Sequence, residues 1–342
     1  MNEAKKTSRI PWIDALKGLT ILAVVIGHCL NGYLNANSFP EVQTVFRLLH
    51  DGIYAYHMPL FFLISGYTFY MAYVRDGTLD RRRFFIQLGN LVLLYVVWAV
   101  LLWVSKRIFA ARVNHAYDLR DLLGMFLTPL GNYWYIYILA LIYILVWVFK
   151  LWKKQTLLLV VGTFAVLFAA KTGAGMLHQT VVRLCSYLFY FCVGIALYRV
   201  PRLVRQKWLF VLSAVCTVAF WHLKFQMETY RIVDLLLDSG LALAMSYLFV
   251  YAAAVIRWKE HGFLQMCGTY CLHIYLIHPY LTAGNRTFLP MLGITQPYMA
   301  LVINAVSSLL ISLGIAVVCQ KLPWTMILFR PAAFIQTCIH KK

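Results

Sequence analysis

The chain has 342 residues, of which 62% are hydrophobic and only 13% are charged, and its mean hydropathy is +0.72. Ordinary globular proteins carry about a quarter charged residues, so this composition excludes a soluble enzyme. The 31 Lys and Arg residues outnumber the 12 Asp and Glu residues and give a net charge of +19, but they lie between apolar segments. There they act as topology signals, so we expect contact with membrane lipid and no nucleic-acid binding.

Ten apolar segments are candidates for crossing a bilayer, and the fifth of them is short. A helix needs about 20 apolar residues to span a hydrocarbon core of about 30 Å. Scanning for such runs predicts an all-α integral membrane protein, a bundle of about ten transmembrane helices. The predicted spans are Ile13–Gly32, Ile53–Tyr73, Phe84–Val104, Tyr133–Trp152, Thr156–Ala170, Val181–Tyr198, Trp208–Leu223, Ile232–Ile256, Phe263–Leu281 and Tyr298–Val318.

Basic residues are divided unequally between the two sides of this arrangement. With a cytoplasmic amino terminus, 20 cations lie on the inner side and 10 on the outer side, and Lys17 lies within the first span. Because cytoplasmic loops are enriched in Lys and Arg, this ratio predicts an N-in/C-in topology. The outer connection between spans three and four is predicted to hold an amphipathic helix in the membrane interface. Its apolar residues recur at helical spacing: Leu119, Leu122, Leu123, Phe126 and Leu127, beside Arg120 and Asp121.

The whole chain, residues 1–342, is expected to form a single polytopic membrane domain with no appended soluble domain. Asp14 and Lys17 interrupt the first apolar run and no small-residue cleavage site follows it, which argues against a secretory signal peptide. The cysteines contain no CxxC pair, so neither a disulfide framework nor a zinc site is indicated. They are Cys29, Cys185, Cys192, Cys216, Cys267, Cys271, Cys319 and Cys338.

Ionisable residues within predicted spans are candidate functional residues, because burying them in a membrane is costly. Lys17 and His28 are 11 residues apart, which places them on one face of a helix and about 16 Å apart along its axis. Lys17 lies near the cytoplasmic boundary, one turn from Asp14, and His28 lies near the outer end. Two structural alternatives remain open: Lys17 extends to the interface, and His28 makes an interhelical hydrogen bond.

Two more histidines lie at a similar predicted depth. His57 is close to the outer start of span two, and His278 is close to the outer end of span nine. Three imidazoles at one level suggest a polar cavity suited to proton transfer near neutral pH. A metal site built from them is not expected, because no acidic ligand is apparent at that depth.

Span two contains residues that affect helix geometry and packing. Pro59 is best tolerated in the first turn of a helix, so the regular helix is expected to begin nearer Tyr56 than Ile53. Ser65 and Gly66 allow another helix or a thin ligand to approach closely. Ordinary small-residue packing explains this pair equally well.

Several motifs, taken in order, resemble the acyltransferase 3 family of integral membrane acyltransferases. The resemblance covers residues 9–320, nearly the whole chain. The first motif is a basic residue, ten residues and a histidine, here Lys17 to His28. The others are His57–Tyr67 with its Phe-Phe-x-x-Ser-Gly run, Asn132–Tyr135, Phe191–Gly194 and Gly268–His278.

The resemblance implies an O-acyltransferase of the cell membrane. Such proteins move an acyl group, usually acetyl from acetyl-CoA, to hydroxyls of extracytoplasmic glycans or other envelope molecules. The family often has basic residues and a proline at the start of span three, where this chain has Gln87, Asn90 and Leu94. Contacts to the CoA phosphates would then fall to Lys17 and the upstream cluster Arg81, Arg82 and Arg83. A solvated positive-inside cluster is the simpler explanation of these three arginines.

Roles follow from joining the resemblance to the residues. Lys17 would anchor the donor electrostatically, and His28 would be the general base or would form a covalent acyl-histidine. His57, Ser65 and His278 would orient His28 or stabilise oxyanion charge. A homo-oligomer is compatible with these expectations. Two rivals remain open: a proton-coupled transporter, for which no symmetry between the halves is visible, and a non-catalytic membrane protein on the same fold.

Overall fold

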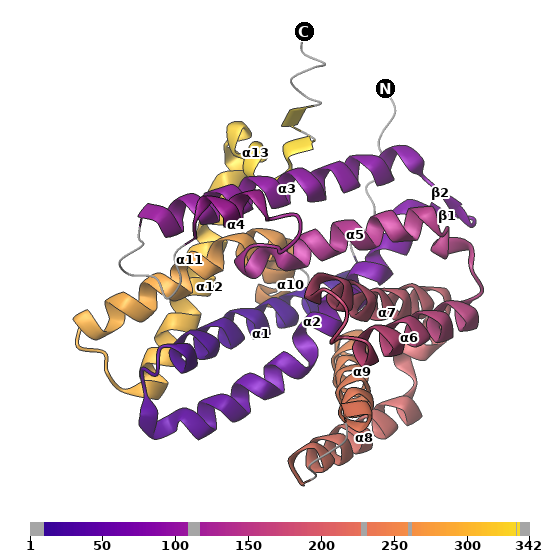
Figure 1. Cartoon of the computed structure of the whole chain (residues 1–342), viewed down its shortest axis with the longest axis horizontal. Coiled ribbons are helices and arrows are strands. Elements are labelled where there is room, and N and C mark those ends of the chain that lie inside the picture. The colour runs from indigo at the N-terminus through magenta and orange to yellow at the C-terminus, as the bar shows by residue number, and fades with distance from the viewer. Residues whose placement is uncertain (1–9, 109–116, 227–230, 259–261, 333, 336–342) are drawn as a thin grey trace.

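A computed structural model describes residues 10–108, 117–226, 231–258, 262–332 and 334–335 (Figure 1). The all-α prediction is confirmed, because the strands of the described residues are confined to one two-stranded hairpin. The hairpin consists of β1 Val74–Arg75 and β2 Thr78–Leu79. The helices are α1 Pro11–Asn35, α2 Gln43–Tyr73, α3 Arg81–Ile108, α4 Leu119–Leu123, α5 Trp134–Val148, α6 Thr156–Thr172, α7 Gln179–Arg199, α8 Lys207–Gln226, α9 Arg231–Val255, α10 Phe263–Thr269, α11 Cys271–Met291, α12 Pro297–Lys321 and α13 Met326–Phe329.

Six helices of the described residues are long and apolar enough to cross a membrane, and α6 is a shorter apolar helix. The six are α1, α3, α5 with its preceding 3₁₀ turn, α7, α9 and α12. The chain is therefore a multi-pass membrane protein. Helices α2, α8 and the pair α10–α11 cover the other predicted spans. The number ten and the N-in/C-in orientation stay predictions, and Lys5, Lys6, Arg9, Arg112, Lys259, Lys341 and Lys342 of the cation count lie outside the described residues.

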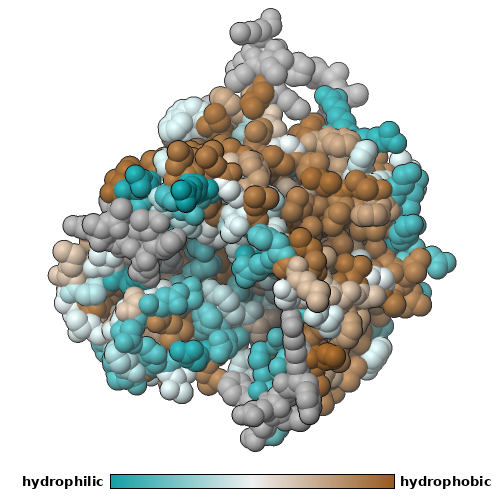
Figure 2. All heavy atoms as spheres, in the orientation of Figure 1, coloured by the Kyte–Doolittle hydropathy of each residue, from teal (hydrophilic) through white to brown (hydrophobic). Residues whose placement is uncertain are grey.

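Large apolar side chains cover much of the outside of the bundle. Figure 2 shows hydrophobic residues gathered over the region of α3 and α5, where Phe85, Leu101 and Trp147 are among those exposed. Helices α8 and α12 also expose apolar residues along their length. Because a soluble protein seldom exposes such large continuous apolar surfaces, these faces are suited to contact with lipid.

Helix α1 lies at the centre of one half of the molecule and contacts α2, α9, α10, α11 and α12 (Figure 1). Its apolar run explains why it forms a helix, and Pro11 in its first turn needs no hydrogen-bond donor there. Most of its residues from Ile13 to Tyr33 are buried. Lys17 and His28 are therefore carried by one continuous, well-packed helix.

Glycines allow two pairs of helices to approach backbone to backbone. A Cβ atom at Gly66 of α2 would lie 1.8 Å from the Phe191 carbonyl oxygen of α7, and one at Gly194 would lie 1.9 Å from the Leu63 carbonyl oxygen of α2. Such distances exclude any side chain, so small-residue packing of α2 against α7 accounts for Gly66. No thin ligand is needed to explain this position.

The same kind of contact joins α1 to α10. A Cβ atom at Gly18 would lie 1.9 Å from the Leu264 carbonyl oxygen, and one at Gly268 would lie 1.8 Å from the Asp14 carbonyl oxygen. The start of α1, with Asp14 and Lys17, is thereby held against α10. The relative positions of the residues on these helices depend on glycine at both crossing points.

Two predictions about helix boundaries are wrong. Helix α2 begins at Gln43 and includes Pro59 in its interior, so the helix does not begin near Tyr56. Packing overrides the local preference, and the proline removes the backbone donor to the Ala55 carbonyl. Span nine is two helices, because α10 ends at Thr269 and α11 extends to Met291. Gly268 and Thr269 are poor helix formers, and Gly268 is held against α1.

The helix expected between spans three and four is present but short. Helix α4 contains only Leu119–Leu123, because Gly124 ends it and turns follow. Asp118 and Asp121 form a reciprocal capping box that starts the helix. Leu123 and Leu127 are highly exposed, as an interfacial segment requires. Its position in a membrane interface stays a prediction.

Candidate active site

The structure brings His28 and His278 into direct proximity. Their ring centroids are 5.1 Å apart, although the two residues lie on α1 and α11 and are 250 positions apart in the chain. His278 is completely buried, whereas His28 is only partly buried. Of this pair, His28 is therefore the imidazole that a substrate can reach, and His278 lies behind it.

Hydrogen bonds assign the protons on two of the three predicted histidines. His278 Nδ1 lies 2.9 Å from the Ile274 carbonyl oxygen, and His57 Nδ1 lies 2.8 Å from the Ile53 carbonyl oxygen. A carbonyl oxygen only accepts, so Nδ1 is the donor in both rings and Nε2 of each neutral ring is an acceptor. His278 Nε2 is buried and has no hydrogen-bond partner among the described residues. It is available to a substrate, a water molecule or His28.

His57 joins this pair through an intervening tyrosine. The Tyr54 ring lies 4.7 Å from the His57 ring and 6.3 Å from the His28 ring, in edge-on geometry to both. His57 is buried, like His278. The predicted level of three histidines is therefore a cluster in space, with Tyr54 as a fourth member that the sequence prediction missed.

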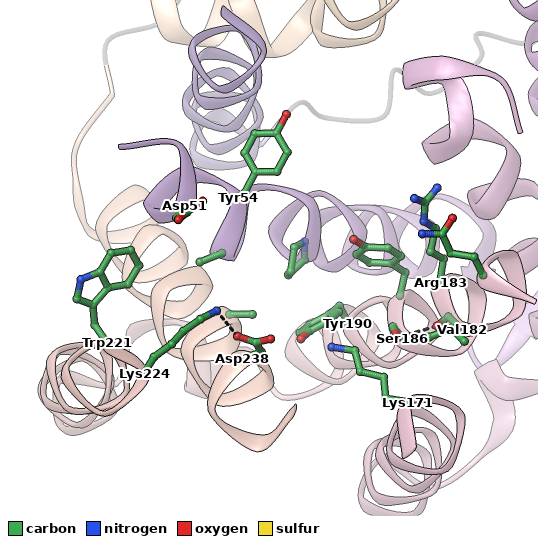
Figure 3. Close-up of a pocket in the computed structure, with 15 residues that line it drawn as sticks. Asp51, Tyr54, Lys171, Val182, Arg183, Ser186, Tyr190, Trp221, Lys224 and Asp238 are labelled. Carbon is green, nitrogen blue, oxygen red and sulfur yellow. Dashed lines mark hydrogen bonds and ion pairs between the residues drawn. The ribbon is translucent and has the colours of Figure 1, made fainter. Parts of the chain in front are cut away.

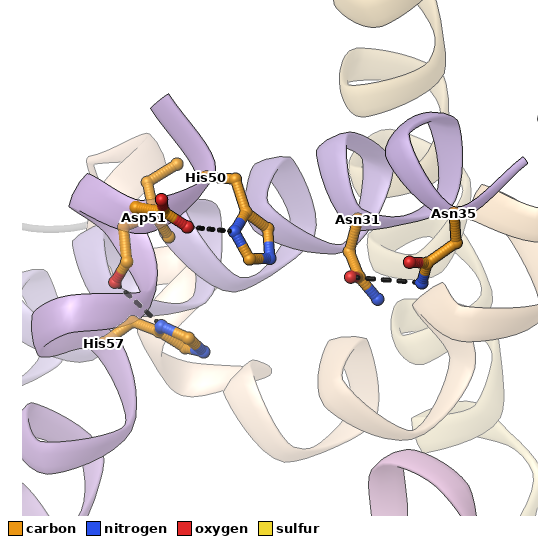
Figure 4. Close-up of polar contacts among 6 residues, drawn as sticks. Asn31, Asn35, His50, Asp51 and His57 are labelled. Carbon is orange, nitrogen blue, oxygen red and sulfur yellow. Dashed lines mark hydrogen bonds and ion pairs between the residues drawn. The ribbon is translucent and has the colours of Figure 1, made fainter. Parts of the chain in front are cut away.

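A fourth histidine was also missed. His50 Nδ1 lies 2.9 Å from Asp51 Oδ1 (Figure 4). The His50 ring also stacks on Tyr54 with centroids 3.9 Å apart. Its Nε2 atom is buried and has no partner among the described residues. His50, Tyr54 and His57 follow the i, i+4, i+7 spacing of one helix face, which would have revealed them. The signal was missed because the predicted span began at Ile53.

Ser65 does not belong to the histidine cluster. It lies eight residues beyond His57, about 12 Å along α2. Its hydroxyl lies 2.7 Å from the Tyr135 hydroxyl and donates to the Phe61 carbonyl oxygen at 2.8 Å. The Tyr135 ring lies 5.5 Å from Tyr275, and Tyr275 in turn lies 6.2 Å from His278. A row of tyrosines thus connects Ser65 to the cluster.

Two of the motifs dock on each other where α5 begins. Tyr133 donates a hydrogen bond of 2.9 Å to the Leu276 carbonyl oxygen of α11, and Tyr275 of α11 donates one to the Asn132 carbonyl oxygen. Tyr133 and Tyr275 are both buried. These reciprocal bonds fix the segment of α11 that carries His278, which gives the aromatic motif at Asn132–Tyr135 a structural purpose.

Lys17 lies at the other end of α1 from His28. Its Nζ atom is 3.7 Å from Asp14 Oδ1, and the two side chains are 29% and 18% exposed. The eleven-residue separation corresponds to about 16 Å along the axis, as expected from the sequence. Lys17 is therefore partly accessible, paired with Asp14, and separate from the histidine cluster.

The arginine cluster lies outside the bundle. Arg81, Arg82 and Arg83 are exposed in the first turn of α3, directly after the β1–β2 hairpin. The tight turn of that hairpin uses Asp76 and Gly77 with positive φ angles of 48° and 73°. Arg83 pairs with Asp80, with its Nε 3.3 Å from Oδ2. The three arginines are accessible to an anion, and no contact with Lys17 is observed among the described residues.

A cavity of about 540 Å³ with charged residues in its lining lies beside the histidine cluster, between α2 and the neighbouring ends of α6, α7, α8 and α9 (Figure 3). Tyr54, which contacts both His28 and His57, also lines this cavity. So do Ala55, whose carbonyl has lost its backbone donor, and Pro59. The charged residues that line it are Asp51, Lys171, Arg183, Lys224 and Asp238. No pattern in the sequence indicates this cavity, because its lining comes from five helices.

Among the described residues, no group of three or more His, Cys, Asp or Glu side chains is arranged to hold a metal ion. The four histidines are instead joined by ring contacts, directly or through Tyr54, and three of them bond to a backbone carbonyl or to Asp51. Such an arrangement is suited to accepting and returning protons at a substrate hydroxyl. The cavity beside it has the size of a small-molecule site.

Comparison with known proteins identifies the family. An acyltransferase domain model matches residues 10–320. The nodulation protein NolL of Mesorhizobium japonicum is 29% identical over 237 residues, which is 66% of this chain and 58% of that protein. NolL of Sinorhizobium fredii is 26% identical over 276 residues, 75% of this chain and 70% of that protein. The chain thus spans less than two thirds of the first relative, and no solved structure matches it.

The family match and the geometry agree with each other. The matched range contains α1 with Lys17 and His28, the α2–α7 crossing and the α5–α11 contact. The motifs that suggested the resemblance thus lie in segments that pack against one another. The chain is a multi-pass membrane protein that belongs to the acyltransferase 3 family.

Proposed function

We propose that this protein transfers an acetyl group from cytoplasmic acetyl-CoA to a hydroxyl group of an extracytoplasmic glycan of the cell envelope. The observation that carries the proposal is the pairing of His28 with His278 at one end of α1 while Lys17 lies at the other end. A donor bound near Lys17 and an acceptor bound near His28 would lie on opposite sides of the membrane. Helix α1 would then lie along the path of the acyl group.

In this mechanism His28 acts as general base. It takes the proton of the acceptor hydroxyl as the oxygen attacks the thioester carbonyl carbon. The new C–O bond forms, the C–S bond breaks, and the proton returns to the thiolate so that CoA leaves as a thiol. His278 and His57 orient His28 and exclude water, because both are buried and fixed by backbone hydrogen bonds. Ser65 acts at a distance through Tyr135.

Lys17 and the α3 arginines would hold the donor. Phosphate groups are bound well by Lys as a point charge and by Arg in bidentate geometry. Lys17 is partly accessible beside Asp14, and Arg81, Arg82 and Arg83 are exposed at the start of α3. These groups are expected on the cytoplasmic side, which contains acetyl-CoA.

Lys17 provides a test of donor binding. Because its charge matters more than its shape, Lys17→Arg should retain substantial activity, whereas Lys17→Met should weaken acetyl-CoA binding by about tenfold or more. A titration of purified protein with acetyl-CoA measures this difference. Lys321→Met is a suitable control, since Lys321 is an exposed cation at the end of α12. Equal donor affinity in all three variants would favour a lysine that merely extends to the interface.

Sidedness tests the transfer itself. Inside-out membrane vesicles supplied with labelled acetyl-CoA should deposit label on acceptor in their lumen. Right-side-out vesicles should react only after acetyl-CoA is loaded inside. Labelled acceptor on the same side as the added donor, in sealed vesicles, would contradict a transmembrane transfer.

Cysteine accessibility checks the topology independently of activity. Arg286 donates a 2.7 Å hydrogen bond to the Gly32 carbonyl oxygen, so this part of α11 and the end of α1 lie at the same level. An Ala36→Cys variant should react with an impermeant thiol reagent from outside intact cells. Arg202→Cys should react only in inside-out vesicles, above the background of the native cysteines. Ala36 and Arg202 are both exposed.

A further inference from the structure

The 540 Å³ cavity lies on the side of the bundle where the proposed function requires an acceptor. Its lining comes from the outer half of α2 and from the ends of α6 to α9 that lie on the same side. Tyr54 is shared between the cavity and the histidine cluster, with its ring 6.3 Å from that of His28. Lys17 belongs to the other end of α1. A molecule in the cavity would therefore lie against Tyr54, whose ring borders His28, and not against the donor anchor.

The lining is chemically unlike a lipid site. Four aromatic rings and five charged side chains surround the space, and the aromatic residues are Tyr54, Tyr187, Tyr190 and Trp221. Charged groups at this depth are costly unless they serve a polar ligand or one another. Aromatic faces combined with hydrogen-bonding groups fit a sugar ring, which has an apolar face and a polar edge.

Charges in the cavity are arranged asymmetrically. Lys224 Nζ lies 2.5 Å from Asp238 Oδ1, so these two neutralise each other where α8 meets α9 (Figure 3). Asp51 is on the α2 side and pairs with His50. Lys171 and Arg183 belong to the end of α6 and the start of α7. Lys171 also interacts electrostatically with Asp238. The three cations of the lining exceed its two carboxylates by one, and Arg183 supplies the excess positive charge.

Arg183 is held in a way that leaves its charge available. Its guanidinium group lies over the Trp134 ring, 5.2 Å from the centroid, and no carboxylate of the described residues pairs with it. A ring face fixes the group without neutralising it, so its N–H edge can still bind an anion in a bidentate manner. Gln179 and Val182 of the first turn of α7 also line the cavity. The positive end of the α7 helix dipole there also favours an anionic ligand.

We propose that the cavity binds an acidic acceptor, a sugar whose carboxylate or phosphate group is held by Arg183 and Lys171 while its hydroxyl group lies at Tyr54, the residue shared with the histidine cluster. That this ligand is the acyl acceptor rests on the proposed function, but binding of the ligand to the cavity can be tested without acetyl-CoA. The aromatic residues stack on the sugar ring. Asp51, beside His50, accepts hydrogen bonds from hydroxyl groups of the sugar.

Three probes that share one ring separate the chemistries: glucose, glucuronate and glucose 6-phosphate differ only at C6. Their dissociation constants are measured by ligand-observed NMR on the full chain in nanodiscs of neutral phosphatidylcholine, so that lipid head groups do not compete. At least one acidic sugar should bind about tenfold or more tightly than glucose, with affinity that falls as salt is raised. Whichever acidic sugar binds more tightly identifies the anionic group as carboxylate or phosphate.

Variants assign the binding to the cavity. Arg183→Gln and Lys171→Gln should each lower the affinity for the acidic sugar by about tenfold without changing the affinity for glucose. Arg183→Lys should recover part of the lost affinity. Arg202→Gln removes an exposed cation from the 3₁₀ turn Pro201–Arg205, outside this cavity, and should bind like the parent protein. Thermal unfolding of each variant shows whether it is folded. The two independent variants keep the test valid if one of them is unstable.

Several outcomes would overturn the proposal. Equal affinity for glucose and both acidic sugars would contradict an acidic ligand, and so would a failure of both acidic sugars to bind. Affinities unchanged in both Arg183→Gln and Lys171→Gln would place the anion elsewhere. Failure of the proposed function is distinct, because acetyl-CoA would then be neither bound nor cleaved while acidic sugars still bound the cavity.

Discussion

Replacing His28 by alanine should lower the rate of acetyl transfer by about 10² to 10⁴ while the protein still reaches the membrane in normal amount. The reason is the position of this ring, which is the partly accessible member of a cluster whose other predicted members, His57 and His278, are buried. Removing a general base leaves the donor bound but the acceptor hydroxyl unactivated. Acetyl-CoA binding should therefore be almost unchanged.

The measurement is transfer of labelled acetyl groups in membranes, together with acetyl-CoA hydrolysis by the purified protein. His222→Ala is the matched control, because His222 is an exposed histidine of α8 outside the cluster. His278→Ala should reduce the rate less than His28→Ala and should also change its pH profile, since His278 acts through His28. Turnover of His28→Ala close to that of the control would show that another group is the base.

A second large effect is expected from adding a single methyl group where α2 crosses α7. In Gly66→Ala the new Cβ would lie 1.8 Å from the backbone oxygen of Phe191, which cannot move away by changing a rotamer. The helices would have to separate, and we expect a loss of stability of about 3 kcal/mol or more and little folded protein. Thermal unfolding and the yield of monodisperse protein measure the effect.

Gly162→Ala is the control for this change. No heavy atom lies within 4 Å of a Cβ built at Gly162 of α6, so the same substitution should be neutral or slightly stabilising there. Gly194→Ala should destabilise the protein as Gly66→Ala does. The double variant should lose less stability than the sum of the two single losses, because both changes strain one helix crossing. If Gly66→Ala were as stable as Gly162→Ala, the helices would not be in backbone contact at this point.

The sequence by itself determined the class of protein and most of the helices. Apolar runs of about 20 residues are a local property, so α1, α3, α7, α9 and α12 could be located without a structure. Lys17 and His28 lie on one continuous helix, and helical periodicity alone relates them. The motifs around His57 and His278 also indicated the family that the domain match identifies.

Boundaries were less predictable where packing overrides local preference. Pro59 suggests a helix start, yet tertiary contacts carry α2 back to Gln43 and so bring His50 and Tyr54 onto the same face as His57. Nothing in the sequence distinguishes Gly268 from other residues of predicted span nine, but its contact with the Asp14 backbone holds α10 against α1. Neither effect is visible in hydropathy, which depends on the type of each residue and not on the residues that it contacts in space.

Only the tertiary structure decided which residues meet. Hydropathy gives the depth of His28 and His278, but their 5.1 Å approach depends on how α1 packs against α11. Ser65 lies at a different depth along α2 from His57, because the rise of the helix separates them. Its hydroxyl group instead contacts the Tyr135 hydroxyl group. The cavity beside the histidine cluster is made by residues from five helices, so no single segment encodes it. Packing between distant segments depends on the complementarity of many side chains at once, and a one-dimensional pattern does not contain it.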